Sequence, residues 1–430
     1  MPSKLPLPPG RYGLPLIGES LAFAKDPAQF LLERFQRYGP VFKTSVLGMK
    51  LICFIGREGF AFFHDASNVR RQGANPGSVI QSLGGPISSH FLDGSAHRRR
   101  KRLTLKTFWP NALAEYTPRM EAITRRHLAR WDAKGEVSGV EAFHRLALAI
   151  GANLILGTPI SEDAEELYEP LTRAARLLAE PPINLPGTAY HAALQANRAV
   201  SARVRKAVDE YVEGDSNVLV GWLFATRFGG TKLGVDEIHA EATDNFFTIF
   251  NGMGSALALA TLGLSNHPEV VDRARSELLA GRTEYLDRAM HEARRYFPMF
   301  SIPGFGIMVA DRELNGYYIP KGWHVTAAIH ATHRDPSIFH DADAFDTERF
   351  CPGGEATPLN TYVAHAGGTP DEYAHHCSAE PFADAMLVLV MRTILRTHTW
   401  ELPPQDLTLD PKIVPFPQPR DGLRIRFRRI

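Results

Sequence analysis

Residues 362–377 read Tyr-Val-Ala-His-Ala-Gly-Gly-Thr-Pro-Asp-Glu-Tyr-Ala-His-His-Cys, and an apolar pattern with helical spacing begins just after them. This pattern predicts a loop that delivers Cys377 to the N-terminus of a helix, where the helix dipole and unpaired backbone N–H groups stabilise a thiolate. A thiolate so placed can ligate a haem iron. A buried, inert cysteine is the other interpretation of these residues, and the rest of the chain must decide between the two.

The composition is that of an ordinary soluble globular protein. Hydrophobic residues make up 44% and charged residues 22% of the 430 residues. The formal net charge of +1 provides no global field that would recruit nucleic acid or an acidic membrane. Three cysteines, Cys53, Cys351 and Cys377, cannot form a disulfide framework, and their spacing matches no zinc site. We therefore expect a cytoplasmic protein without a nucleic-acid partner, and the first ten residues predict no membrane anchor.

Helical patterns dominate the middle of the chain, from about His97 to Phe297. One long helix is predicted from Val235 to Leu264, ending before a Ser-Asn-His-Pro sequence. Near the N-terminus, Val41–Val46 and Leu51–Ile55 have the pattern of a β-hairpin around residues 47–50. The expected fold is therefore mainly α with small β regions, an α+β architecture.

Four further signals occur in a fixed order. Glu292 and Arg295 are three residues apart on one predicted helix face. They are followed by His-Arg-Asp-Pro at 333–336, by Phe-Asp-Thr-Glu-Arg-Phe at 345–350, and then by Cys377. Each signal is weak alone, but the ordered set, with an opening Pro-Pro-Gly, resembles the cytochrome P-450 superfamily over nearly the whole chain.

The resemblance implies one large domain over residues 1–430, folded around a buried haem b. It makes Cys377 the proximal iron ligand and therefore the metal-binding residue. It also implies that Glu292 and Arg295 are buried with Arg349 as their third partner, since a buried charge must be paired. Cys53 and Cys351 do not match the ligand position and are interpreted as structural.

The basic run at 97–102, His-Arg-Arg-Arg-Lys-Arg, allows a solvated helix face, a nucleic-acid patch or a clamp for haem propionates. The small net charge argues against nucleic acid. The resemblance implies that His97 and Lys101 contact a propionate and that the other basic residues of the run are exposed. His375 stands where the family has an arginine that holds a propionate, so it is a third candidate. A second propionate arginine is missing from residues 304–307.

The long helix departs from the family pattern in residues 246–255, Phe-Phe-Thr-Ile-Phe-Asn-Gly-Met-Gly-Ser. Monooxygenases of the family have an acid and then an alcohol here, which relay protons to bound dioxygen. Counting back from the His-Pro that follows the helix places Asn251 and Gly252 at these positions, as the candidate catalytic residues. Another register would place Gly254 and Ser255 there. Neither register contains a carboxylate, and an amide cannot donate and regain a proton, so we do not expect efficient dioxygen cleavage.

Three subfamily comparisons disagree about the substrate. The lengthened Gly-Gly loop before His-Cys is similar to that of fatty-acid peroxygenases, which use hydrogen peroxide. Phe250-Asn251 is similar to the Phe-Asn of plant enzymes that rearrange hydroperoxides. The N-terminal third is similar to retinoid- and sterol-oxidising members. Drift within an ordinary monooxygenase is a fourth explanation of the altered motifs.

The sequence thus favours oxygen insertion into a lipophilic small molecule such as a lipid, terpenoid or polyketide. The roof of the pocket is expected in the apolar segments 72–91 and 177–190, and Arg70 and Arg71 are the candidates for contacting a charged substrate. Electrons would come from a ferredoxin and its reductase, or hydrogen peroxide would replace them. The alternatives are an isomerase or lyase that needs no external electrons, and a haem protein without enzymatic activity.

Overall fold

The structure is a computed structural model, and it describes residues 5–46, 48–215, 217–297, 299–412 and 416–430. The chain forms two compact units, each assembled from three separate segments. Unit 1 contains Met1–Pro76, His90–Arg99 and Phe300–Cys377, and unit 2 contains Gly77–Ser89, Arg100–Met299 and Ser378–Ile430. The prediction of one domain over residues 1–430 stays a prediction.

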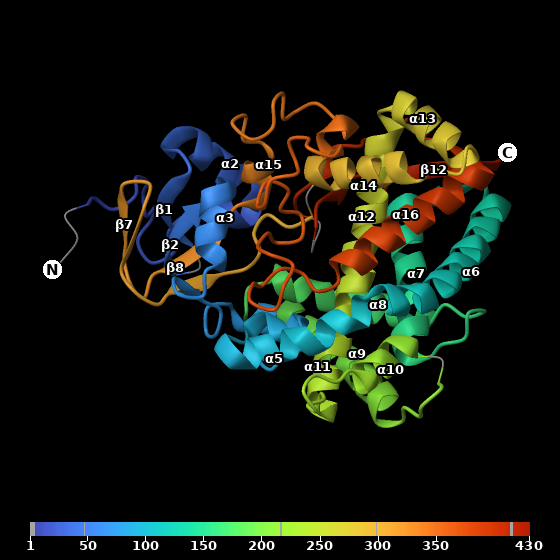
Figure 1. Ribbon diagram of the computed structural model, residues 1–430, viewed down its shortest axis with the longest axis horizontal. Helices are drawn as coiled ribbons and strands as arrows, with labels where there is room; N and C mark the ends of the chain where they lie inside the picture. The colour runs from blue at the N-terminus through green and yellow to red at the C-terminus, as the bar shows by residue number, and fades with distance from the viewer. Residues whose placement is uncertain (1–4, 47, 216, 298, 413–415) are drawn as a thin grey trace. The chain divides into compact units, whose positions relative to one another are not determined.

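Unit 1 is built on a five-stranded sheet with the strand order β1-β2-β8-β5-β3; β1, β2 and β8 are labelled in Figure 1. Its strands are β1 (Val41–Val46), β2 (Met49–Phe54), β3 (Val69–Arg70), β5 (Gly306–Met308) and β8 (His324–Ala327). β1 and β2 pair as an antiparallel hairpin with Val46 opposite Met49, and β8 joins β2 in parallel. The predicted hairpin is confirmed, and Leu47 of its turn lies outside the described residues.

Short helices and a second hairpin complete unit 1. They are α1 (Ser20–Lys25), α2 (Pro27–Tyr38), α3 (Gly56–His64), α15 (Ile329–His333), the 3-10 helix η7 (Thr347–Phe350), and the strands β6 (Arg312–Leu314) and β7 (Tyr317–Ile319). The sheet buries Ile52, Phe54, Val325 and Ala327 in one cluster together with Phe60 of α3. This packing fixes α3 on the sheet, and α3 in turn supports the loop that ends at Cys377.

Unit 2 is mainly helical. Its helices are α4 (Gly77–Ser82), η2 (Lys106–Phe108), α6 (Pro110–Lys134), α7 (Gly139–Gly151), η3 (Ala152–Leu156), η4 (Glu165–Leu167), α8 (Tyr168–Ala175), η5 (Arg176–Leu178), α9 (Ala189–Asp209), α10 (Val218–Ala225), α13 (Pro268–Leu279), α14 (Glu284–Tyr296) and α16 (Glu380–Thr397). Two small sheets contain β4 (Glu136–Ser138), β12 (Arg424–Arg429) and β9 (His398–Glu401), and β10 (Leu409–Asp410) and β11 (Gln418–Pro419). The expected fold class, mainly α with small β regions, is confirmed.

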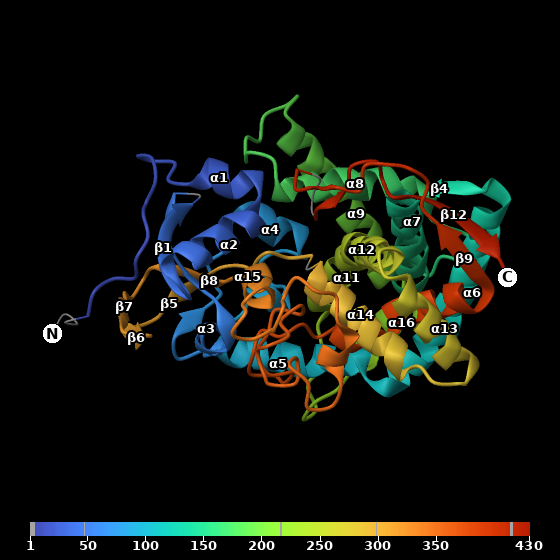
Figure 2. The ribbon, with the colours of Figure 1, turned by 90° about the horizontal axis from the view of Figure 1, so that it is seen from above.

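The predicted long helix is present as α11 (Val235–Thr248), a π-helical turn η6 (Ile249–Met253) and α12 (Gly254–Ser265) in direct succession (Figure 2). We call this continuous element the distal helix. The segments Gly139–Leu156 and Val235–Ser265 are long and apolar enough to span a membrane. However, the most apolar 18-residue stretch of the first is 78% buried inside the protein, and that of the second is 94% buried. They therefore serve as the core helices of unit 2.

Two helices lie on the boundary between the units in the sequence. The 3-10 helix η1 (Ser89–Phe91) begins in unit 2 and ends in unit 1. Helix α5 (Gly94–Leu105) carries the basic run, and its residues belong to unit 1 up to Arg99 and to unit 2 from Arg100.

Candidate functional site

Cys377 ends a loop that is held together by hydrogen bonds between its own residues. The backbone N–H of Cys377 donates to the carbonyl of His365 at 3.3 Å, and Nδ1 of His376 lies 3.1 Å from the carbonyl of Gly367, to which it donates. Helix α16 begins at Glu380, close behind the cysteine in the chain, as predicted. The Cys377 side chain is only half-buried, which fits a reactive ligand better than an inert core cysteine.

The Gly-Gly pair allows this loop to pack directly on α3. Gly367 and Gly368 have φ angles of 73° and 82°, which glycine adopts without strain. A Cβ on Gly367 would lie 2.6 Å from Cδ1 of Phe60, and a Cβ on Gly368 would lie 2.9 Å from Nδ1 of His64. The loop before the cysteine is therefore held against a rigid helix.

His97 and His375, predicted separately as cofactor-binding residues, lie together in unit 1. Their imidazole rings stack with centroids 3.9 Å apart and planes inclined by 24°. The carboxylate of Asp93 lies 3.8 Å from Nε2 of His375. Both histidines line a cavity that Arg71 also lines. The third predicted residue, Lys101, is buried one turn after His97 in α5.

Arg71 is a cationic residue of this cavity that the motifs did not single out as a cofactor-binding residue. Its side chain is 5% exposed, and its guanidinium lies 3.6 Å from the centre of the Phe63 ring. Burial lowers the pKa of Arg71 to about 9, against the opposing effect of Asp93. The adjacent Arg70 is exposed, so only one of the two arginines is placed to bind a buried anion.

Asn251 and Gly252, the predicted catalytic residues, lie in the π-helical turn of the distal helix. Asn251 is 2% exposed, and its Nδ2–H donates to the carbonyl of Phe247 at 3.1 Å. Gly252 is also buried, yet a Cβ added to it would meet none of the described atoms outside its own helix backbone within 4 Å. Among the described residues, open space therefore adjoins the distal helix at Gly252.

The alternative register, with Ser255 as the alcohol, does not fit the structure. Ser255 is fully buried, and its Oγ accepts a hydrogen bond from Nε2 of Gln418 at 2.6 Å. Nδ1 of His144 donates to the carbonyl of Val140 at 2.7 Å, so Nε2 of His144 can accept from Ser255 Oγ, 3.4 Å away. Burial lowers the pKa of His144, which keeps its ring neutral. Ser255 is therefore committed to packing the distal helix.

Arg100 corrects the expectation that the remaining basic residues of α5 are exposed. It is 3% exposed, and its guanidinium donates to Glu241 at 2.8 Å and to Glu237 at 2.7 Å. Glu241 also accepts hydrogen bonds from the backbone N–H and the hydroxyl of Ser89, both at 2.9 Å. The prediction was wrong because the acidic partner lies on the distal helix, far away in the sequence. This network ties the predicted roof segment to the distal helix.

The substitution Glu241→Gln is expected to destabilise the protein by about 1–2 kcal/mol, because an amide cannot replace every charged hydrogen bond of the carboxylate. Urea unfolding measures the loss, and hydrogen exchange should show faster exchange in residues 77–89. Glu237→Gln is the matched control, because the Glu237 side chain is 26% exposed and pairs with the same arginine. Equal effects of the two substitutions would contradict a special role for Glu241.

Glu292 and Arg295 are fully buried, as predicted. The guanidinium of Arg295 donates to both carboxylate oxygens of Glu292, at 2.6 and 2.8 Å. Arg349, in unit 1, is also buried and donates to the carbonyl of Asp341 at 2.8 Å. The predicted pairing of Arg349 with Glu292 stays a prediction.

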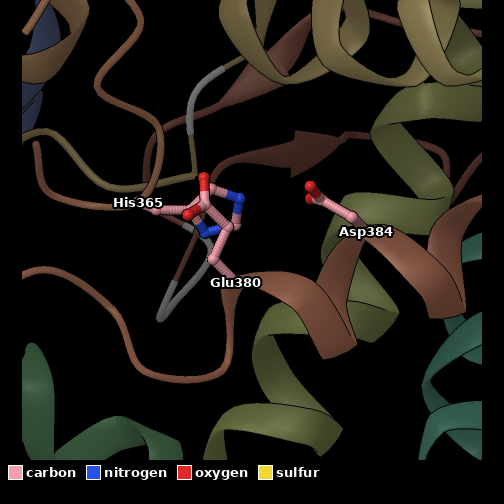
Figure 3. Close-up of side chains that lie close together, drawn as sticks. All are labelled: His365, Glu380 and Asp384. Carbon is pink, nitrogen blue, oxygen red and sulfur yellow. The ribbon is translucent and has the colours of Figure 1, made fainter. Parts of the chain in front are cut away.

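Helix α16, which follows Cys377, is anchored to α14 by an ion-pair cluster near its N-terminus. Glu380 and Asp384 project from the first turns of α16, while His365 belongs to the preceding loop (Figure 3). The carboxylate of Asp384 lies 2.6 Å from Nη2 of Arg294 and 3.3 Å from Nε2 of His291, both on α14. Asp384 therefore fixes the helix rather than providing a free carboxylate for catalysis.

Comparison with known proteins agrees with these features. The family model described as Cytochrome P-450 matches residues 8–424. A putative cytochrome P-450 120 of Synechocystis sp. is 29% identical over 100% of this chain and 98% of its own length. Cytochrome P-450 26C1 of Homo sapiens is 28% identical over 99% of this chain and 89% of its own length.

Comparison with solved structures also finds proteins of the cytochrome P-450 family. The retinoic acid-bound cyanobacterial CYP120A1 superposes with a TM-score of 0.88 at 28% identity and covers 100% of both chains. Ligand-free cytochrome P-450 OleT superposes with a TM-score of 0.84 at 20% identity over 98% of this chain and 99% of its own, which supports the fold alone. The chain therefore belongs to the cytochrome P-450 family, whose members are haem enzymes with monooxygenase or peroxygenase activity.

Proposed function

We propose that this protein binds haem b through the thiolate of Cys377 and inserts oxygen into a lipophilic small molecule, with hydrogen peroxide as the oxidant. Haem ligated by a thiolate supplies the chemistry of O–O bond cleavage. The observation that carries the choice of oxidant is the π-helical turn Ile249–Met253, which contains Asn251 and Gly252; the resemblance implies that these two residues stand where monooxygenases have an acid and an alcohol. No carboxyl proton donor is therefore available at these two positions.

The residues near Cys377 fit a haem. The half-buried cysteine is presented by an anchored loop, and His97, His375 and Arg71 line a cavity that fits an anionic group. Lys101 is proposed to add a second cation from α5, one turn after His97. In unit 2, the open space at Gly252 among the described residues supports a large ligand beside the distal helix.

Asn251 is proposed to position the oxidant or the substrate rather than to transfer a proton. Its Nδ2 donates to the carbonyl of Phe247, which fixes the orientation of the amide and leaves its oxygen as a hydrogen-bond acceptor. Hydrogen peroxide already carries the protons and electrons that an acid–alcohol pair would have to relay. An enzyme driven by peroxide can therefore dispense with a carboxylate at this position.

The substrate is proposed to be a lipid, a terpenoid or a polyketide. In unit 2, Phe247 of the distal helix packs with Ala174 and Ala175 of α8 and with the partly buried Leu83, so the roof segment 72–91 is apolar where Leu83 meets this helix. The cyanobacterial CYP120A1 structure, at 28% identity, holds retinoic acid, a long apolar ligand. Apolar surroundings and this ligand support a lipophilic substrate.

We also propose a cytoplasmic location and, should oxygen be used, a ferredoxin with its reductase as the electron donor. A reducing compartment agrees with three free cysteines. Cys53 is fully buried in β2, where burial raises the pKa of its thiol, and Cys351 donates from Sγ to Glu348 at 2.9 Å. Both cysteines therefore have structural surroundings.

A panel of lipophilic substrates tests the function, with each substrate incubated with peroxide, with NAD(P)H and redox partners, or with neither. The proposal expects oxygenated product with peroxide alone. Product that forms only with the redox partners would contradict the choice of oxidant. Substrate consumption with neither addition would indicate an isomerase or lyase instead.

The double substitution Asn251→Asp with Gly252→Thr is expected to raise the yield of oxygenated product per NAD(P)H consumed by roughly tenfold or more, since general acid catalysis contributes 10²–10⁴-fold. The β-carbon of threonine is accommodated, because a Cβ at position 252 would meet none of the described atoms outside its own helix backbone within 4 Å. Gly252→Ala is the control, which fills the same space without a hydroxyl group. An unchanged yield in the double variant would show that the absent proton donors do not limit dioxygen cleavage.

A further inference from the structure

The guanidinium of Arg71 has an unusual environment for a charged group. It is 5% exposed and lies over the ring of Phe63. Within the described part of the chain, Nη1 of Arg71 is buried and has no hydrogen-bond partner. A buried cation is destabilising unless it is paired, so this side chain requires an anionic partner that the described residues do not supply by hydrogen bonding.

The nearest carboxylate, that of Asp93, is already engaged by the backbone. One oxygen of Asp93 accepts from the backbone N–H of Arg71 at 2.9 Å, and the other accepts from the backbone N–H of Gln72 at 2.8 Å. Asp93 therefore fixes the start of the segment after β3 and places Arg71 in the cavity. The charge of Asp93 raises the pKa of Arg71 and so favours its charged form. The oxygens of Asp93, however, accept hydrogen bonds from backbone N–H groups.

A glycine on the neighbouring strand makes room for Arg71. β3 pairs with β5 so that Val69 lies opposite Met308 and Arg70 opposite Ile307. A Cβ on Gly306 would lie 2.2 Å from Cγ1 of Val69 and 3.4 Å from Nη1 of Arg71. Any side chain at position 306 would therefore collide with Val69 and crowd the guanidinium. Residues 304–307 contain no arginine, but the guanidinium of Arg71, the residue that follows β3, lies beside Gly306 of β5.

We propose that Arg71 binds a carboxylate, and that this carboxylate is a propionate of the haem. The cavity lined by Arg71 also contains His375, two residues before Cys377. Two residues of extended chain span at most about 7 Å, so the cavity lies near the edge of any porphyrin whose iron the cysteine binds. The stacked rings of His97 and His375 offer N–H donors, whereas Arg71 offers a guanidinium that is charged at neutral pH and can donate two parallel N–H bonds. This inference rests on the proposed haem-thiolate function.

The first test compares Arg71→Leu with Arg70→Leu in the holoenzyme, because Arg70 is the exposed neighbour. Haem transfer to an excess of apomyoglobin should be roughly ten- to a hundredfold faster in Arg71→Leu, as expected for the loss of a charged hydrogen bond. It should be unchanged in Arg70→Leu. Arg71→Lys, which keeps the charge but loses the bidentate geometry, should be intermediate and replaces the leucine variant if that variant fails to fold. Equal rates in wild type and the Arg71 variants would overturn the proposal.

The second test distinguishes the two sources of a carboxylate. The wild type should prefer haem over haem dimethyl ester, and the Arg71 variants should lose most of that preference. If they instead keep it and lose the preference for a fatty acid over its methyl ester, measured by the substrate-induced Soret shift, Arg71 binds the substrate and the haem assignment is wrong. A wild-type protein that binds no haem would contradict the proposed function itself, which separates the two failures.

Discussion

The substitution Glu292→Leu is expected to lower the free energy of unfolding by about 3–5 kcal/mol, the usual cost of leaving a buried charge without its partner. Both side chains of the Glu292–Arg295 pair are fully buried, and the guanidinium binds both carboxylate oxygens. Removing the carboxylate takes this ion pair away from the buried guanidinium of Arg295. Such a loss is a large fraction of the stability of a typical folded protein, and poor recovery of soluble protein is the first sign.

Denaturant unfolding of the purified variants measures this effect. Glu292→Gln should be less harmful, since an amide oxygen still accepts a hydrogen bond from Arg295. The matched control is Glu169→Leu, because Glu169 pairs with Arg173 on the surface of α8 with exposures of 69% and 51%. That pair should contribute no more than about 0.5 kcal/mol. If Glu292→Leu and Glu169→Leu had equal effects, the buried pair would not stabilise the core.

The substitution Cys377→Ser is expected to reduce oxygenated product to below about one hundredth of the wild-type rate, a barrier increase of at least about 2.7 kcal/mol. A serine hydroxyl stays protonated near neutral pH and donates far less electron density than a thiolate. The measurement is product formation under whichever oxidant supports the wild type, together with the haem content of each preparation.

Cys351→Ser is the control for this prediction. Cys351 is also half-buried and its Sγ donates to Glu348, a hydrogen bond that a serine hydroxyl can replace. We expect wild-type activity and haem content in this variant. Full activity of Cys377→Ser, or an equal loss in Cys351→Ser, would remove Cys377 from its assigned role.

Local sequence patterns predicted the elements well, because those patterns act over short distances. The distal helix was expected from Val235 to Leu264 and extends from Val235 to Ser265. Its π-turn was not predicted. Contacts from distant segments are made directly after that turn, at the start of α12, among them the ring of His144 against Gly254 and the hydrogen bond from Gln418 to Ser255. Nothing in the local pattern specifies those partners.

In the candidate site, too, local patterns could be predicted and contacts between distant segments could not. The order of motifs identified Cys377, and the spacing on α5 identified His97 as a candidate that the structure places against His375. Arg100 was expected to be exposed because a basic run usually faces solvent, but Glu241 on the distal helix buries it. The sequence offered Arg70 and Arg71 together as contacts for a charged substrate and could not tell which of them is buried, because the environment of Arg71 depends on the pairing of β3 with β5.

The presence of a thiolate-ligated haem is tested most directly by the absorption spectrum of the wild-type protein, reduced and saturated with carbon monoxide. Ligation by the sulfur of Cys377 predicts the long-wavelength Soret band of a haem-thiolate carbonyl complex, and predicts its loss in Cys377→Ser. A purified protein without porphyrin, or a carbonyl complex with the shorter-wavelength band of histidine ligation, would contradict the account.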